Sequence, residues 1–206
     1  DLDGLDSITW SPDGSKIAIN GLALTVWDAA TGEQIQAWSS AYPITTYTVV
    51  KWLSDGEQIA ASTLKGDIEI WNVVSGELLL RFDAHPRGVL TLAQSPESRQ
   101  LASIGGHEFA FEGSSRRVKV WDTATGTLLT ELEKGITTGD ATFYEYALAW
   151  SPDGRWLAST SDDGTVHLWD TTSWELVRVD KRFYSLVHTD DYISPTPIPT
   201  ATPNLD

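Results

Sequence analysis

A hydroxyl, an imidazole and a carboxylate of the kinds that build a nucleophilic catalyst occur in this 206-residue sequence as Ser103, His85 and Asp163. Catalysis would require the three side chains to converge, with the base within hydrogen-bond reach of the hydroxyl. A Gly-x-Ser-x-Gly segment, the turn that exposes the nucleophile in many hydrolases, does not occur in the sequence. We therefore expect no catalysis by these residues and no enzyme activity in this chain.

Two short acidic segments, residues 1–4 and 161–164, are similar to the start of a calcium-binding loop. Neither continues to the bidentate glutamate that completes an EF-hand, and turn chemistry explains their Asp-Gly pairs without an ion. His107 and His188 have no partner at ligand spacing, and the sequence contains 0 cysteines, which excludes thiolate zinc sites. We therefore predict that the chain uses no metal and no cofactor.

The charge balance is strongly acidic, with 14 Lys and Arg against 29 Asp and Glu and a net charge of −15. Such a surface repels phosphate, so we expect no nucleic-acid groove. No apolar run approaches the roughly 20 residues that span a bilayer, so we expect no membrane insertion. The composition leaves the cellular compartment open. The sequence begins at Asp1 and contains 0 methionines, from which we expect it to be part of a longer or processed chain.

A repeat organises the sequence. Four of its 10 tryptophans follow a β-branched or aliphatic pair, precede Asp or Asn, and are separated by 44, 50 and 48 residues. The four copies are residues 24–28, 68–72, 118–122 and 166–170. A fixed period of this length is typical of solenoids and propellers.

Turn signals flank every copy. A Ser-Pro-Asp-Gly segment or a variant of it precedes each tryptophan, and a Thr-Gly or Ser-Gly pair follows the first three. These residues favour tight turns, because Pro presets φ, Asp bonds its own backbone and Gly accepts positive φ. The runs between the turns are short and rich in β-branched, Leu and aromatic residues, so each unit is predicted to contain four antiparallel strands, a to d.

Alternation in strand c indicates how the units pack. In residues 118–121 the two valines face one side, while Lys119 and Trp121 face the other. Apolar bulk on both faces requires both to be covered, so neighbouring units must stack on each other.

On these motifs the sequence resembles the WD-repeat family of β-propellers over roughly residues 5–180. The resemblance rests on the Trp-Asp pairs, the Ser-Pro-Asp-Gly turns and the Leu-Ala-Ser runs at 101–103 and 157–159. It implies an all-β fold with about four blades, expected to be part of a larger ring.

The resemblance also implies a buried hydrogen-bonded group in each blade: His before strand a, Ser or Thr in strand b, Asp in the b–c turn and Trp in strand c. The residues matching these positions are His85, Ser103 and Trp121 in the third unit, Ser159, Asp163 and Trp169 in the fourth, Trp71 in the second and Trp27 alone in the first. Ala61 and Lys65 replace the hydroxyl and the carboxylate in the second unit. We therefore predict incomplete networks, divergent blades held mainly by apolar packing, and structural roles for His85, Ser103 and Asp163.

We expect one propeller portion over residues 1–193, with units at approximately 5–40, 47–84, 88–134 and 146–182. Residues 194–206 alternate Pro and Thr with little to bury, which is typical of a stiff linker or tail.

Length variation is concentrated on the rim formed by the b–c and d–a loops. The long segments are residues 39–46, 105–116 and 134–145, and long loops on a rigid scaffold commonly bind partners. The candidate partner-binding residues on them are Tyr42, His107, Phe109, Phe111, Arg116, Phe143 and Tyr144. The alternative for Phe109 and Phe111 is that they fold back over the blade edge.

The sequence therefore predicts a non-catalytic scaffold that binds another protein, or another domain of its own parent chain, through this rim. One alternative is a sensory or targeting propeller in a larger bacterial enzyme, a kinase or a peptidase, whose catalytic domain lies elsewhere. Another is a propeller of the prolyl-oligopeptidase type, against which the recurrent Trp-Asp pairs argue. A further alternative for assembly is a homodimer in which two such arcs close one ring.

Overall fold

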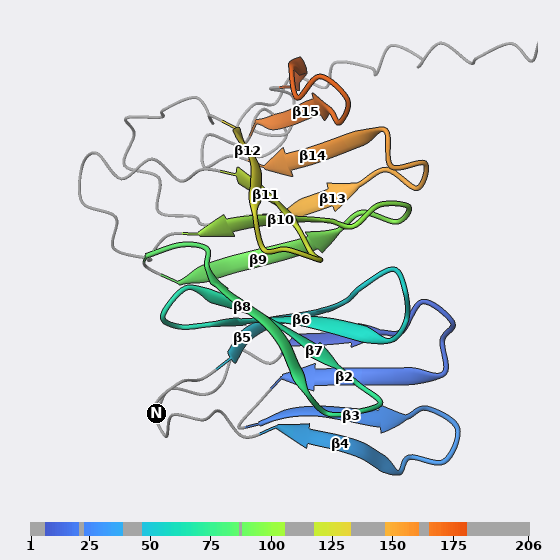
Figure 1. Cartoon of the computed structure of the whole chain (residues 1–206). Coiled ribbons are helices and arrows are strands. Elements are labelled where there is room, and N and C mark those ends of the chain that lie inside the picture. Colours follow the sequence, from blue (N-terminus) through green and yellow to red (C-terminus); the bar gives the residue numbers. More distant parts are fainter. Residues whose placement is uncertain are drawn as a thin grey trace, which may run out of the picture.

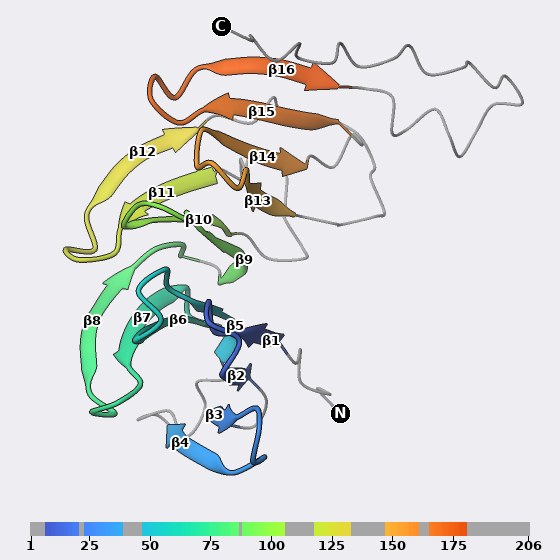
Figure 2. The same ribbon diagram turned by 90° about the vertical axis from the view of Figure 1, so that its right-hand side faces the viewer.

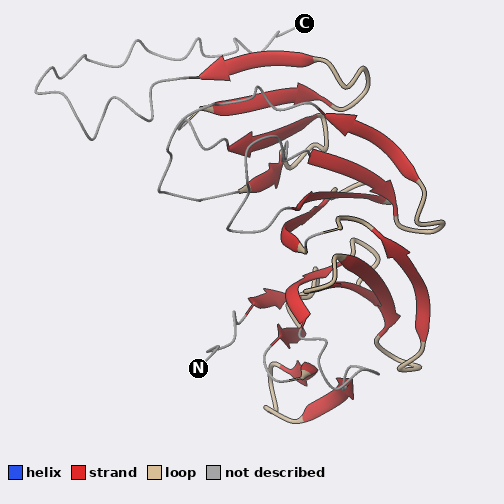
Figure 3. Cartoon of the chain, turned by 90° about the vertical axis from the view of Figure 1, so that its left-hand side faces the viewer, coloured by secondary structure: helices blue, strands red, loops and turns tan. Residues whose placement is uncertain are grey.

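The computed structural model describes residues 7–20, 23–38, 47–86, 88–105, 118–132, 147–160 and 165–180. Their regular elements are all strands, as Figures 1 and 3 show. In chain order the strands are β1 (Ser7–Trp10), β2 (Lys16–Asn20), β3 (Leu24–Asp28), β4 (Gln34–Trp38), β5 (Tyr47–Trp52), β6 (Gln58–Thr63), β7 (Asp67–Asn72), β8 (Leu78–Asp83), β9 (Val89–Gln94), β10 (Gln100–Gly105), β11 (Val118–Asp122), β12 (Leu128–Leu132), β13 (Leu148–Trp150), β14 (Trp156–Thr160), β15 (Val166–Asp170) and β16 (Leu176–Asp180). None of the described segments forms a helix that could span a membrane.

The strands form four antiparallel sheets, each made of four consecutive strands paired with their chain neighbours. We call them blade 1 (β1–β4), blade 2 (β5–β8), blade 3 (β9–β12) and blade 4 (β13–β16). Their first strands lie side by side, with β1 against β5, β5 against β9 and β9 against β13. Figure 2 shows the four sheets fanned around this inner side, with β4, β8 and β12 along the outside. The predicted all-β propeller fold is confirmed.

Local chemistry explains the hairpins. In the a–b turn of blade 1, the Asp13 carboxylate accepts hydrogen bonds from the Ser11 hydroxyl at 2.6 Å and from the Ser15 amide at 2.9 Å. In the c–d turn, the Asp28 carboxylate accepts from the amides of Ala30 and Thr31 at 2.9 and 2.8 Å. Asp and Asn at these places therefore close their own turns, as their side chains favour.

Apolar side chains fill the joints between blades. The front face of a blade is the sheet face toward the preceding blade, and its back face is the one toward the following blade. In the joint between blades 2 and 3, Ile68 and Ile70 on the back face of blade 2 pack against Leu92, Leu101 and Trp121 on the front face of blade 3. Similar clusters fill the other two joints. A sheet therefore buries a face only where another sheet stacks on it, since a single four-stranded sheet leaves apolar surface exposed.

The c–d turn of blade 4 departs from those of the other blades. Gly126 in blade 3 has φ +71° and lies against Leu80 and Phe82 of the preceding blade, where an added Cβ would come within 2.9 Å of the Phe82 ring. Trp174 occupies the corresponding place in blade 4, with φ 59°, and packs into the joint with blade 3. Thr130 stands in blade 3 where blade 2 has Leu80, as the strand registers show. The smaller side chain leaves the volume that Trp174 fills, despite a backbone conformation that is unfavourable for a bulky residue.

Candidate functional site: tryptophan networks and a charged rim

A buried hydrogen-bonded group joins the strands of blade 3. The Ser103 hydroxyl accepts from Trp121 Nε1 at 2.8 Å and shares a second hydrogen bond of 2.8 Å with His85 Nε2. Ser103 has no exposed surface and His85 is almost fully buried. The serine and the histidine therefore lie at hydrogen-bond distance. The hydroxyl is inaccessible to a substrate, however, and already accepts a hydrogen bond from the Trp121 indole. Asp163, the third residue of the catalytic hypothesis, lies outside the described residues.

Two glycines hold His85 in position. Gly66 has φ +95° and its carbonyl accepts from the amides of Ala84 and His85, both at 3.0 Å. A Cβ at Gly66 would overlap the His85 backbone, and a Cβ at Gly105 would overlap the His85 side chain. Lys119 Nζ donates to the Ala84 carbonyl at 2.9 Å. Burial, with a smaller contribution from the Lys119 charge, lowers the pKa of His85 to about 3, so its ring is neutral at physiological pH.

Blade 4 contains part of the same arrangement. Trp169 Nε1 donates to the Ser159 hydroxyl at 3.1 Å, and both residues are buried. The His167 ring lies edge-on to the Trp169 ring at 5.9 Å between centroids. Ser159 pairs opposite His167 across strands β14 and β15, as Ser103 pairs opposite Lys119 in blade 3. The tryptophan thus reaches diagonally across the strands to the hydroxyl.

Blades 1 and 2 satisfy the tryptophan differently. The strand-b position diagonal to the tryptophan is Ile19 in blade 1, opposite Thr25, and Ala61 in blade 2, opposite Glu69. Neither side chain has a hydroxyl. The indole N–H therefore bonds within its own strand, from Trp27 to Thr25 Oγ1 at 2.9 Å and from Trp71 to Glu69 Oε2 at 3.1 Å. In blade 1 the acceptor for Trp27 is thus Thr25, a residue outside the positions that the resemblance implied. The sequence carried a signal for this, since the residue two before each repeat tryptophan is polar in all four copies.

Glu69 belongs to a charged cluster that the sequence analysis did not identify. Arg81 on β8 reaches across to β7, where its Nη2 lies 2.6 Å from Asp67 Oδ2 and its Nη1 lies 3.6 Å from Glu69 Oε1. Burial raises the pKa of Asp67, but hydrogen bonds from Arg81 and from Asp83 outweigh it, so the pKa ends below its usual value. Asp83 pairs directly opposite Asp67. The hydrogen bond between these two carboxyl groups, together with the charge on Asp67, raises the pKa of Asp83.

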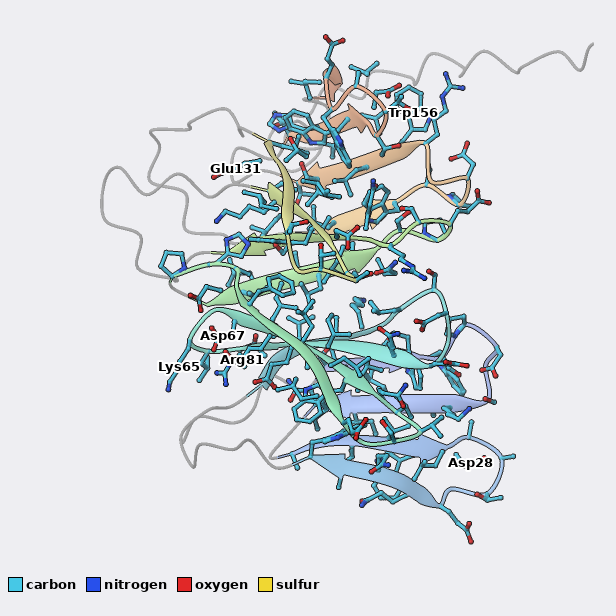
Figure 4. The ribbon with its side chains drawn as sticks, viewed as in Figure 1. Asp28, Lys65, Asp67, Arg81, Glu131 and Trp156 are labelled. Atoms are coloured by element: carbon cyan, nitrogen blue, oxygen red, sulfur yellow. The ribbon has the colours of Figure 1, made fainter. Side chains whose placement is uncertain are left out.

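The cluster lies on the rim of the b–c and d–a connections. Asp67 begins β7 directly after the b–c turn, and Asp83 ends β8 directly before the d–a connection. Figure 4 shows Lys65, Asp67 and Arg81 together on this edge, with Asp28 on the opposite rim. The candidate partner-binding residues Tyr42, His107, Phe109, Phe111, Arg116, Phe143 and Tyr144 lie outside the described residues. Because β4, β10 and β12 precede the segments that carry them, these segments start from the same rim.

Polar contacts also fasten the blades to each other, and the sequence did not predict them. Trp38 Nε1 donates to the Gly76 carbonyl at 2.9 Å, and Trp150 Nε1 donates to the Ala93 carbonyl at 3.0 Å, in both cases across the joint between adjacent blades. The Thr48 hydroxyl donates to a backbone carbonyl of β9 at 3.1 Å. The blades are therefore joined by hydrogen bonds as well as by apolar packing.

The family model of the WD domain, G-beta repeat, matches residues 76–122 and 140–170. Protein HIR1 of Cryptococcus neoformans is 26% identical over 200 residues, covering 82% of this chain and 21% of HIR1. Cell division cycle 20.1, cofactor of APC complex, from Arabidopsis thaliana is 23% identical, covering 80% of this chain and 53% of the relative. Actin-interacting protein 1 of Drosophila melanogaster is 28% identical, covering 63% of this chain and 27% of the relative.

A chain in the crystal structure of a mitotic checkpoint complex superposes with a TM-score of 0.68 and 23% identity. The match covers 88% of this chain and 52% of that chain, and it shows the same fold. The chain thus spans between about a fifth and about half of the length of these relatives. Four sheets of this topology and the matches to the repeat show that the chain is an all-β propeller built from WD-type blades.

Proposed function

We propose that this chain is a protein-interaction scaffold that binds its partner through the rim of the b–c and d–a connections. The observation that carries the proposal is the contrast between its two rims. At the a–b and c–d rim, carboxylates are engaged by their own turns: the Ser11 hydroxyl lowers the pKa of Asp13, and the Thr31 amide lowers that of Asp28. The opposite rim carries the charged cluster of Asp67, Arg81 and Asp83, and the long connecting segments start from the strand ends on this same rim.

The names of the relatives support a binding role rather than a chemical one. One is a cofactor of the APC complex, one is an actin-interacting protein, and the structural match belongs to a checkpoint complex. The partner would be another protein or another domain of the same parent chain. The net charge of −15 favours a basic partner surface and disfavours nucleic acid.

The mechanism would be passive. The stacked blades fix the strand ends from which the rim segments start, which limits the conformational entropy that binding would cost. Aromatic residues such as Phe109, Phe111 and Phe143 would supply contact area at modest entropic cost.

A second setting for the same rim is a sensory or targeting module within a larger bacterial enzyme. The Pro- and Thr-rich segment 194–206 is the observation that favours it, since such segments connect domains. In that setting the partner would be a ligand protein or the catalytic domain of the same chain.

Site-specific photocrosslinking tests the rim. A photoreactive phenylalanine analogue is placed at Phe109 or at Phe143, and as a control at Val74, which is exposed on the opposite rim. We expect one recurrent crosslinked protein from the first two positions and none from the third. Equal crosslinking from all three positions would contradict the proposal.

The variant Phe109→Ser/Phe111→Ser separates binding from packing. If these residues contact a partner, the melting temperature stays within about 2 °C of the unchanged protein and the crosslink from position 143 is lost. A large fall in melting temperature would assign both rings to packing against the blade edge instead.

A further inference from the structure

The front face of blade 1 exposes side chains that the other blades bury. Ile8 and Trp10 on β1 occupy the places that Val50 and Trp52 occupy on β5, as the strand registers show. Ile8 is 63% exposed and Trp10 is 58% exposed, whereas Val50 is 0% and Trp52 is 5% exposed. Among the described strands, none lies against this face as blade 1 lies against the front face of blade 2.

The opposite end of the stack shows the reverse surface. Ala158 and Leu168 on the back face of blade 4 are partly exposed, while the corresponding Ala102 and Val120 on the back face of blade 3 are fully buried. Ala149 on β13 is exposed, whereas Ala93 at the same place on β9 is buried. The two end faces therefore expose, on strands a to c, positions that are buried in the joints between blades.

The joint between blades 3 and 4 shows what such a joint contains. Trp150 crosses from the front face of blade 4 and donates its indole N–H to the Ala93 carbonyl at 3.0 Å. Trp10 corresponds to Trp150, and Ala149 corresponds to Ala93, so the same donor and acceptor stand at the two ends of this chain. On strands β1 to β3, the described residues of the front face of blade 1 are Ile8, Trp10, Ile17, Ile19, Thr25 and Trp27, and none of these six is charged.

From these correspondences we propose that a second copy of this chain docks head to tail, with the front face of blade 1 of one copy on the back face of blade 4 of the other. The contact is heterologous, because it joins different surfaces of identical chains. Two copies form two such joints and close a ring of eight blades, a number within the range of closed propellers. The proposal is independent of the rim function, since the end faces lie between blades and the rim lies at their edges.

Sedimentation velocity of the whole chain at micromolar concentration tests the proposal. We expect a single species of twice the 22.6 kDa chain mass. Trp10→Lys should give the monomer, because it places a charge in the joint and removes the donor. Leu79→Lys on the outer strand β8 is the matched control, since Leu79 is 49% exposed and stands outside the joints. It should leave the dimer intact.

Mixing two variants tests the polarity of the contact. Trp10→Lys disables the front face and Ala149→Arg disables the back face, so each variant alone should be a monomer. A mixture retains one intact joint and should form a heterodimer, detected with a fluorescent label on one variant. Trp10 and Ala149 are both exposed, so folding, followed by circular dichroism, should be unchanged in both variants.

Three results would overturn the proposal. One is a folded wild-type monomer at 50 µM or above, which would assign the faces to another occupant, such as a blade from a longer chain. Another is a dimer that Trp10→Lys leaves unchanged. The third is a ladder of species above the dimer, which would show that head-to-tail contacts propagate without closing a ring.

Discussion

The indole N–H of Trp71 donates to Glu69 Oε2 at 3.1 Å, and so a buried glutamate in blade 2 takes over the role that a strand-b serine has in blade 3. Glu69 also faces the Arg81 guanidinium at 3.6 Å, which offsets part of the cost of burying its charge. The absence of a hydroxyl at Ala61 is thus compensated within the same sheet.

Glu69→Ala should lower the free energy of unfolding by about 2–3 kcal/mol, because it removes the acceptor of Trp71 and one carboxylate beside Arg81. Urea unfolding followed by tryptophan fluorescence measures the loss. Adding Ala61→Ser should recover about 1 kcal/mol by restoring a diagonal acceptor. Glu57→Ala, at an exposed turn residue, is the control and should cost less than about 0.5 kcal/mol. No recovery in the double variant would show that Trp71 does not depend on this hydrogen bond.

Ser103→Ala should destabilise the protein more than Ser159→Ala. The first hydroxyl contacts both an indole and an imidazole, and the second contacts one indole among the described residues. We expect losses of about 2–3 and about 1 kcal/mol, measured by chemical denaturation. Equal losses would mean that the His85 contact contributes nothing to stability.

Stability should fall in acid partly through His85. Its pKa is near 6.5 in the unfolded chain and about 3 in the folded protein, so the unfolded state binds the proton more readily. The contribution of His85 is therefore complete above pH 6.5 and is lost progressively as the pH falls toward 3, with a slope of up to about 1.4 kcal/mol per pH unit. His85→Asn should be less stable at pH 7, and its stability should vary less between pH 6.5 and 4. An unchanged slope would refute the assignment.

Trp174→Gly should destabilise the joint between blades 3 and 4 by about 1–2 kcal/mol. Relief of the positive φ at position 174 returns about 1 kcal/mol, but the loss of a partly buried indole costs more. Adding Thr130→Leu should restore part of the loss, because it recreates the contact that Leu80 makes with Gly126. Thermal denaturation of the single and double variants measures the coupling. Additive effects would show that residues 130 and 174 do not share this volume.

The sequence alone determined the repeat and the four strands of each unit, because these depend on local turn chemistry and on alternation along single strands. Asp13 and Asp28 close their turns through residues within three positions, so their neighbours were enough to predict them. The polar contacts of Trp71, Trp38 and Trp150 depend instead on which atoms the strand register and the stacking of blades bring together.

Tertiary structure also decided which tryptophans are interior. Trp10 and Trp52 end equivalent strands and are followed by similar turns, so their sequence contexts are much alike. One is exposed and the other is buried, because burial depends on whether a blade lies against that face. A property of neighbours in space has no counterpart in the pattern of a single repeat, so only the arrangement of the blades could reveal it.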